Sequence, residues 1–460
     1  MNHILITSSK ESFNPIPLMR NGSNDNKLPD LGFVNDAPIR EELLRFIQKN
    51  WNQGIAPQAQ ANDLRNFIDK INSEASAGKV VLFIGLHDGN IPTLQYIRDA
   101  LCEKYSYASY TVYLNNYTED ERGDRSFCCN GSLGDLCYVI QNIKDMPVYV
   151  QAHSKWSFLG SLFKGINPNI KVVQELYDWF TFFIPVGKEE VFVEAGVFIN
   201  SEIDLIRHFE KFMLSFIDGV VYKNGGPAVN GILQDSTSDT LQIMPAPSLS
   251  FAQKPVNDQV HPRTRLVYAG QVKNSDYFPA IFGDMYLLPI FKQFINSGYG
   301  VDIFCSYSRD EQHYKTQFSE YLSEERVNRN LRIHPRLSVR NLISRLSGSY
   351  DYGLVLFNES ENLVVGKDHV ETASASKLFT YLFAGLPVIV SAELKYMASL
   401  VEQHGLGVVL DNSELLDLPR YLNGLDYNAL LQNVEASQKL FCIENWLPGI
   451  NELLHSNGRG

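Results

Sequence analysis

The chain contains 460 residues, which is more than one ordinary hydrophobic core uses, so two or three domains are expected. Its net charge of −12 excludes a general binder of phosphate backbones and makes nucleic acid an unsuitable partner. With 44% hydrophobic and 20% charged residues it has a globular composition, and no apolar run is long enough to span a bilayer. Residues 1–9 lack the basic flank and apolar core of a secretory signal, and the six cysteines are scattered, so we expect reduced thiols and a cytoplasmic protein.

Buried strands alternate with helices through the first half of the chain. Residues 1–78 are expected to form an N-terminal extension of loops and two helices, near 39–49 and 62–76. The elements that follow are a strand at 79–86, a helix ending near 104, strands at 110–114 and 148–152, a helix at 158–164, a strand at 171–175, a helix at 203–216 and a strand at 219–222. This alternation predicts a parallel, doubly wound sheet and a first Rossmann-like domain over 79–250.

The same alternation returns after a segment rich in proline and polar residues, and we predict the interdomain linker at 251–262. The expected strands are 265–269, 301–305, 331–334, 352–357 and 388–390, and the expected helices are 285–296, 311–322, 339–347 and 376–384. They define a second Rossmann-like domain over 263–430. A helical tail at 431–460 either caps its own domain or crosses back to the first one. The predicted fold class is therefore α/β, with two Rossmann-like, doubly wound parallel-sheet domains that face a central cleft.

The most informative stretch is 375–390, which reads ASKLFTYLFAGLPVIV. It predicts a polar loop, a short helix, a turn at Gly385 and Pro387, and a buried strand. The start of the helix leaves backbone N–H groups without intrahelical partners, and Ser376 and Lys377 lie beside them. This end of the helix is therefore a candidate site for a diphosphate.

This string resembles the donor-site motif of GT-B glycosyltransferases related to retaining family four, in which Ser/Asn-Lys-Leu-x-x-Tyr-Leu-Ala-Ala-Gly-x-Pro-Val-Ile leads into a strand. The resemblance covers roughly 79–410 in layout, but only this string is specific. It implies transfer of a sugar from a nucleotide diphosphate sugar to a hydroxyl of a glycan, a lipid-linked acceptor or a protein. It also implies retention of configuration, no metal and no cofactor beyond the donor substrate.

The resemblance assigns roles to particular residues. Catalytic roles fall to Asp178, Lys273 and Lys377. Donor binding falls to Gly270, Lys273, Pro335, Leu337, Phe357, Glu361, Ser376, Lys377, Leu378 and Thr380, and acceptor binding to His87, Asp88, His153 and Asp178. From the residues alone, Lys273 is equally well explained as a solvated loop lysine, and an aspartate at a strand end, such as Asp178, is more often a helix cap than a catalyst. In the resembling enzymes a cation at the position of Lys273 neutralises the leaving diphosphate.

One departure from the family pattern leaves other functions open. Relatives carry a glutamate in the motif helix, which binds the donor ribose, and another eight positions earlier, whereas this chain has Thr380 and Thr372. A non-catalytic, glycosyltransferase-like partner subunit is the main alternative, and a sugar-nucleotide 2-epimerase is a further one. The chain lacks Gly-x-Gly-x-x-Gly, a Walker-type phosphate loop and His-Glu-x-x-His, which disfavours a dehydrogenase, a nucleotide hydrolase or a zinc hydrolase. Peripheral contact with a membrane, the oligomeric state, the sugar and the linkage stay open.

Overall fold

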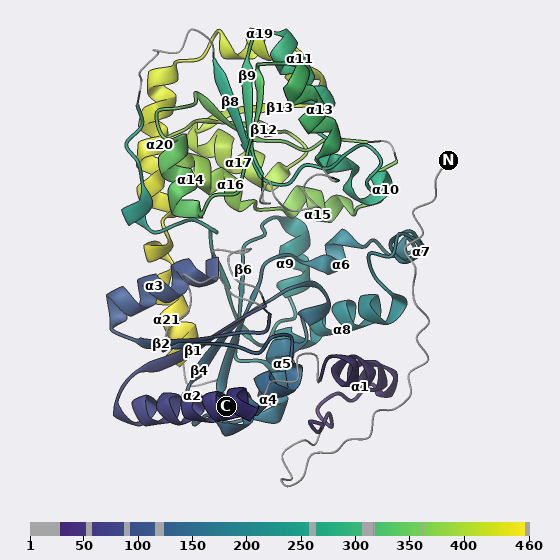
Figure 1. Ribbon diagram of the computed structural model, residues 1–460, viewed down its shortest axis with the longest axis vertical. Helices are drawn as coiled ribbons and strands as arrows, with labels where there is room; N and C mark the ends of the chain where they lie inside the picture. The colour runs from purple at the N-terminus through teal and green to yellow at the C-terminus, as the bar shows by residue number, and fades with distance from the viewer. Residues whose placement is uncertain are drawn as a thin grey trace.

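The computed structural model describes residues 28–51, 58–86, 93–115, 124–256, 264–305, 316, 318–360 and 362–455. It contains two lobes, each built around a parallel β-sheet with helices on both faces (Figure 1). Among the described helices, none is both long enough and apolar enough to cross a membrane.

The first lobe contains a seven-stranded sheet in the order β3-β2-β1-β4-β5-β6-β7. Its elements are α1 (Ala37–Trp51), α2 (Gln58–Ala77), β1 (Val80–Gly85), α3 (Thr93–Tyr105), β2 (Ala108–Tyr113), β3 (Ser126–Cys128), α4 (Leu133–Asn142), β4 (Pro147–Ala152), α5 (Leu159–Ile166), β5 (Lys171–Leu176), α6 (Phe180–Phe183), α7 (Glu189–Glu194), α8 (Asn200–Phe216), β6 (Gly219–Tyr222), α9 (Pro227–Leu233) and β7 (Asp239–Gln242). The edge strands β3 and β7 are absent from the sequence prediction. They are three and four residues long and contain no fully buried residue, so they lack the apolar run that marks a buried strand.

The second lobe contains a six-stranded sheet in the order β10-β9-β8-β11-β12-β13. Its elements are β8 (Arg265–Ala269), α10 (Pro279–Phe282), α11 (Leu288–Asn296), β9 (Gly300–Phe304), α13 (Ser319–Val327), β10 (Leu331–His334), α14 (Val339–Leu346), β11 (Tyr352–Val355), α15 (Lys367–Thr372), α16 (Ser376–Phe383), β12 (Val388–Ser391), α17 (Lys395–His404), β13 (Gly407–Leu410), α18 (Asn412–Leu415), α19 (Leu418–Leu422), α20 (Tyr427–Phe441) and α21 (Leu447–His455). This strand order is that of dinucleotide-binding Rossmann domains, and it reverses between β8 and β11. Ligands of such sheets bind at the carboxyl ends of the strands beside that reversal.

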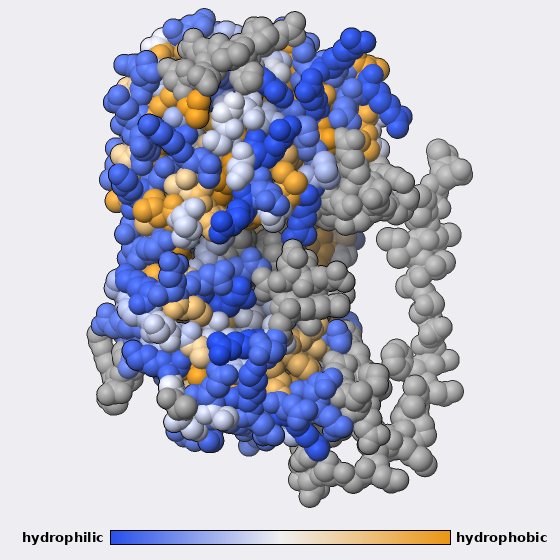
Figure 2. Space-filling model, turned by 60° about the vertical axis from the view of Figure 1, so that its left-hand side comes forward, coloured by the Kyte–Doolittle hydropathy of each residue, from blue (hydrophilic) through white to orange (hydrophobic). Residues whose placement is uncertain are grey.

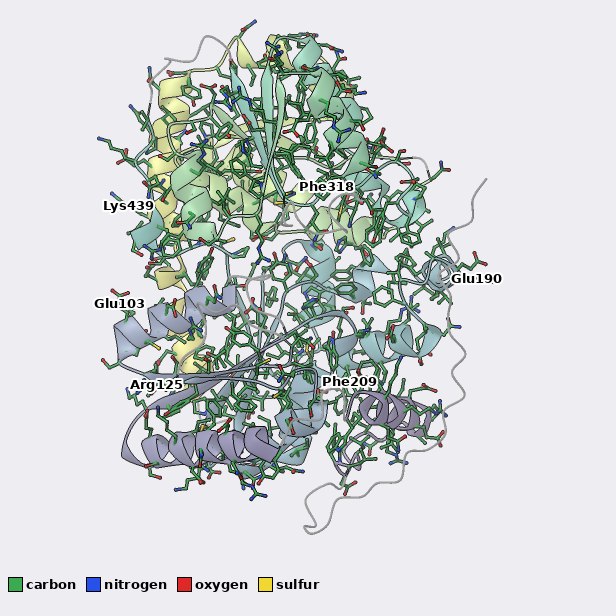
Figure 3. The ribbon with its side chains drawn as sticks, in the orientation of Figure 1. Glu103, Arg125, Glu190, Phe209, Phe318 and Lys439 are labelled. Atoms are coloured by element: carbon green, nitrogen blue, oxygen red, sulfur yellow. The ribbon has the colours of Figure 1, made fainter. Side chains whose placement is uncertain are left out.

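Hydrophobic side chains cover both faces of the first sheet. One face packs against α1, α2, α4, α5 and α8, and Phe209 on α8 is fully buried there. The other face packs against α3 and α21. Figure 3 shows Phe209 and Phe318 pointing into the cores of the two lobes, while Glu103, Glu190 and Lys439 project outward. On the face shown in Figure 2, hydrophilic residues cover most of both lobes.

The chain passes between the lobes twice. It leaves the first lobe after β7, and returns after α20, when α21 crosses onto the first sheet (Figure 1). Ile450 of α21 is fully buried against that sheet, and the Tyr107 hydroxyl donates a hydrogen bond of 2.6 Å to the Asn451 Oδ1. The C-terminal helix is thus part of the first lobe's core.

Candidate functional site

The helix α16 carries the donor-site motif and begins at the junction of the two lobes. The residue before it, Ala375, offers no side-chain acceptor to the first turn, so the first N–H groups face the junction without a capping side chain. The other end is fixed by Gly385, which has a φ of +80° and whose hypothetical Cβ would lie 2.8 Å from the Pro255 Cα. Only glycine fits there.

The Lys377 side chain is held over the end of β8. Its Nζ donates a hydrogen bond of 2.9 Å to the Tyr268 hydroxyl and lies 4.3 Å from the centroid of that ring. A Cβ at Gly270 would lie 3.3 Å from the same Nζ. The sequence-predicted donor residues Gly270, after β8, and Lys377, in the first turn of α16, are 107 positions apart in the sequence. They therefore meet at the carboxyl end of β8, where the strand order reverses.

A carboxyl group that the sequence prediction did not include accompanies this lysine. Asp284 lies in the turn before α11, and its carbonyl accepts a hydrogen bond of 3.2 Å from the Asn358 N–H after β11. Burial raises the pKa of Asp284 to about 6, and the charge of Lys377 acts in the opposite direction. Asp284 thus provides a negative charge that partly offsets Lys377 at neutral pH.

Lys273, the second predicted cation, is only 5% exposed. Its Nζ lies 4.3 Å from the centroid of the Tyr277 ring, and its backbone N–H donates to the Met285 carbonyl at 3.0 Å. Burial lowers the pKa of Lys273 to about 8. The structure therefore rules out a solvated loop lysine and holds this amine in a low-dielectric setting at the end of β8.

The remaining predicted donor residues divide into accessible and buried ones. Pro335 is exposed and Leu337 is partly buried, in a loop that follows His334, whose Nε2 lies 2.7 Å from the Asp302 Oδ1. Phe357 is 8% exposed, and Leu378 is fully buried in the core of the second lobe. The amphipathic helix turns the Leu378 side chain inward and leaves only its backbone near the junction, so its predicted donor-binding role stays a prediction that concerns the backbone alone. Glu361 lies outside the described residues.

The two threonines at the family's glutamate positions share one arrangement. The Thr380 hydroxyl donates to the Ser376 carbonyl at 3.1 Å, and the Thr372 hydroxyl donates to the Asp368 carbonyl at 2.7 Å. Both donors are thus used within their own helices, and Thr380 is 8% exposed. Their oxygens keep lone pairs that can accept a hydrogen bond from a hydroxyl group.

On the side of the first lobe, Asp178 forms an ion pair with a lysine. Its Oδ1 lies 3.2 Å from the Nζ of Lys223, which follows β6. The predicted acceptor residue His153 follows β4, and its ring stacks on Phe180 with a centroid distance of 6.4 Å. Asp178 and His153 therefore both lie at carboxyl ends of strands in the first sheet. His87 and Asp88, which follow β1 in the sequence, lie outside the described residues.

The turn that carries Asp178 is anchored by Glu210 on α8. The Glu210 carboxylate accepts hydrogen bonds of 2.9 Å from each of the Phe180 and Thr181 N–H groups, and one of 2.7 Å from the Thr181 hydroxyl. Glu210 is fully buried, and burial raises its pKa to about 7 although these hydrogen bonds lower it. A buried carboxyl group thereby fixes the first turn of α6 directly after Asp178.

Contacts across the junction join the two sets of residues. The Tyr177 hydroxyl lies 3.4 Å from the Ser376 Oγ, and the Lys223 Nζ donates a hydrogen bond of 2.9 Å to the Ser374 carbonyl. The Gly225 N–H donates to the Thr372 carbonyl at 3.1 Å. The loop before α16 thus meets the carboxyl ends of β5 and β6, so Ser376 of the predicted donor residues and Asp178 of the predicted acceptor residues lie at one junction.

Comparisons with known proteins agree with this layout. The family described as "Glucosyltransferase 3-like, C-terminal domain" matches residues 304–442. HepE of Anabaena, solved in complex with UDP and glucose, is 13% identical, with a TM-score of 0.53 over 82% of this chain and 99% of that chain. The α,α-trehalose 6-phosphate synthase of Burkholderia multivorans is 10% identical, with a TM-score of 0.52 over 82% of this chain and 98% of that chain.

These likenesses define the fold. At such low identities they show the architecture alone, and each match covers 82% of this chain. The chain has the two-domain GT-B fold of glycosyltransferases, and the α/β prediction of two Rossmann-like domains is confirmed. Its C-terminal domain is similar to that of the glucosyltransferase 3-like family.

Proposed function

We propose that this protein is a glycosyltransferase that moves a sugar from a nucleoside diphosphate sugar, bound by the second lobe, to a hydroxyl acceptor bound by the first. The observation that carries the proposal is the approach of Lys377 to Gly270 and Tyr268 at the carboxyl end of β8. A cation, a helix N-terminus and a glycine loop converge there, which suits a diphosphate.

The chemistry follows from which charge develops during the reaction. As the bond between the sugar and the diphosphate breaks, negative charge grows on the leaving diphosphate, and Lys377, Lys273 and the first N–H groups of α16 stabilise it. These groups already carry positive charge or partial charge, so the proposal includes transfer without a divalent ion. Following the resemblance to retaining enzymes, it also includes attack of the acceptor hydroxyl from the face that the diphosphate leaves.

Two further observations bear on the donor and the location. The HepE structure contains UDP and glucose, which favours a uridine diphosphate sugar as the first donor to test. All six cysteines are free, and Cys129 and Cys137 are fully buried thiols, as is usual in a reducing compartment. We therefore include a cytoplasmic location in the proposal.

The alternative is a partner subunit that binds the nucleotide without transferring a sugar. It is favoured by Thr372 and Thr380, whose hydroxyl donors are used inside their helices where the family has carboxylates. One set of measurements distinguishes a protein that transfers a sugar from one that only binds the nucleotide. Purified protein is incubated with several nucleotide sugars, with and without a chelator, and released nucleoside diphosphate is quantified. In parallel, melting temperatures are measured with UDP, GDP and NAD.

A nucleoside diphosphate that binds the native protein must raise its melting temperature, whereas NAD should not. Release of UDP or GDP that persists with the chelator supports the enzyme. A rise in melting temperature without release supports the binding partner. Absence of any shift at about a millimolar nucleoside diphosphate would remove the donor-site assignment, because the stabilisation grows with the ratio of ligand concentration to Kd.

A further inference from the structure

Lys223 contacts both lobes with one side chain. It follows β6 in the first lobe and is 5% exposed. Its Nζ lies 3.2 Å from the Asp178 Oδ1 and 3.5 Å from the centroid of the Tyr177 ring, and it donates a 2.9 Å hydrogen bond to the Ser374 carbonyl in the second lobe. We propose that Lys223 is a positioning residue, which fixes the acceptor-side Asp178 relative to loop 373–375, which leads into the motif helix α16. This inference rests on the proposed function.

The contacts on the first-lobe side keep the lysine charged although it is buried. Burial acts to lower the pKa of Lys223, but Asp178 and Tyr177 outweigh it and raise the pKa above its ordinary value. A buried cation needs such compensation, because an unpaired charge away from water is costly. The orientation of the Asp178 carboxylate therefore depends on the position of the Lys223 ammonium.

The contact on the second-lobe side reaches the loop that leads into α16. Ser374 lies two residues before Ser376 and three before Lys377, so its carbonyl moves with the start of the motif helix. The Tyr177 ring, which lies under the ammonium, also brings its hydroxyl to 3.4 Å from the Ser376 Oγ. Displacement of Lys223 would thus change the spacing between the acceptor-side turn and the phosphate end of α16.

The polar groups beside this contact are incompletely paired. Within the described part of the chain, the side-chain amide of Asn224 and the Ser374 Oγ have no hydrogen-bond partner, although the two residues are 0% and 1% exposed. Unpaired buried groups destabilise the arrangement that buries them. The Lys223 bonds therefore counter an unfavourable contribution at this contact, and their loss should let the two lobes separate.

The test compares two lysines that each pair with an aspartate and donate to a backbone carbonyl. Lys164 pairs with Asp218 at 2.9 Å and donates to the Ile170 carbonyl at 2.9 Å, but all these groups lie in the first lobe. The variants are Lys223→Met, Lys223→Arg and, as the matched control, Lys164→Met. Five quantities are measured for each: the melting temperature, the UDP Kd by calorimetry, kcat and KM for release of UDP from UDP-glucose, and the radius of gyration by small-angle X-ray scattering.

We expect Lys223→Met to lower kcat by about a hundredfold, because a displacement of about 1 Å in reacting groups has effects of that size. Its UDP Kd should change by less than about threefold, since Lys223 lies outside the phosphate-binding set, and its radius of gyration should rise. Lys223→Arg retains the charge and should recover part of kcat. Lys164→Met should lower the melting temperature while leaving kcat and the radius of gyration unchanged.

Equal effects of Lys223→Met and Lys164→Met on kcat and on the radius of gyration would overturn the inference, because they would reduce Lys223 to a stabilising residue. A parallel loss of UDP affinity and kcat in Lys223→Met would also overturn it, by making Lys223 a donor ligand. Failure of the proposed function is distinguished by the wild-type protein, which would then release no nucleoside diphosphate. In that case the radius of gyration of Lys223→Met, compared with that of Lys164→Met, still tests whether Lys223 holds the two lobes together.

Discussion

The Lys377 ammonium donates a hydrogen bond of 2.9 Å to the Tyr268 hydroxyl, so the motif helix α16 and the strand β8 meet through these two side chains. This contact holds the cation at the switch point of the second sheet. It also makes the charge of Lys377 available beside the first N–H groups of α16.

Replacement of Lys377 by alanine should weaken nucleoside diphosphate binding and sugar transfer together. The loss of one charge-assisted phosphate contact should cost about 1.5 to 3 kcal/mol, or roughly ten- to a hundredfold in Kd. Calorimetric titration with UDP measures it. The control is Lys367→Ala, which removes an exposed lysine paired with Glu371 on α15. An unchanged Kd in a folded Lys377→Ala protein would favour a different nucleotide site.

Replacement of Asp284 by asparagine should tighten UDP binding at pH 7.5. The substitution removes the negative charge that offsets Lys377, and one Coulomb contact of this kind is worth on the order of 1 kcal/mol, or about fivefold in Kd. Because the pKa of Asp284 is about 6, the wild-type carboxyl is charged above that pH and neutral below it.

The pH dependence supplies the internal control for Asp284. The ratio of the wild-type Kd to the Asp284→Asn Kd should be largest above pH 7 and should approach one below about pH 5. Titration of the ligand's own phosphate cancels in this ratio. A ratio that stays constant from pH 5 to pH 8 would show that the Asp284 charge does not act on the nucleotide.

Replacement of Glu210 by glutamine should change how stability depends on pH. The folded-state pKa of Glu210 is raised from 4.5 to about 7, so its protonated form favours the folded state. Its stabilising contribution is complete below pH 4.5 and is lost as the pH rises through 7, by roughly 3 kcal/mol in total. The wild type minus Glu210→Gln difference in unfolding free energy, from urea titrations between pH 4.5 and pH 8, should decline across this range. A flat difference would assign Glu210 an ordinary pKa.

Truncation of Ile450 to alanine should destabilise the first lobe. This side chain is fully buried between α21 and the sheet, and comparable large-to-small changes cost about 2 to 5 kcal/mol. Chemical unfolding measures the change. Leu440→Ala on α20 is the matched control, because Leu440 is 48% exposed and its loss should stay within about 0.5 kcal/mol. Equal costs in the two variants would indicate that α21 does not contribute to the core.

Strong periodic segments made most of the fold predictable. The strands at 265–269 and 331–334 agree with β8 and β10 to the residue, because β8 is a short apolar run and β10 alternates buried Leu331 and Ile333 with polar residues. The strand β13 contains two valines but was not predicted. The last strand expected from the sequence was 388–390, at the end of the motif, and no strand was assigned beyond it. The expected helix at 285–296 begins only at Leu288, where Pro289 occupies the first turn.

Residues of the candidate site could be predicted only where they belong to one contiguous sequence motif. The motif at 375–390 placed Lys377, but nothing near Asp178 in the sequence indicates that Lys223, 45 positions later, is its partner. Their contact arises because β5 and β6 are parallel neighbours whose carboxyl ends meet. Charged residues directly after buried strands, such as Lys223 after β6, were the available signal. Asp284 lies in a turn that follows no strand, and the sequence contains no such signal for it.

The helix α21 has a consequence for how the molecule is made. Because residues 447–455 cover one face of the first sheet, that sheet stays partly uncovered on the ribosome until the second lobe has been synthesised. The second lobe is in effect an insertion within the first, and it can complete its own core earlier than the lobe that precedes it in the sequence. Assembly of the N-terminal lobe is therefore expected to be the last step, and nascent chains that stop before Leu447 should remain sensitive to protease in β1, β4 and β5.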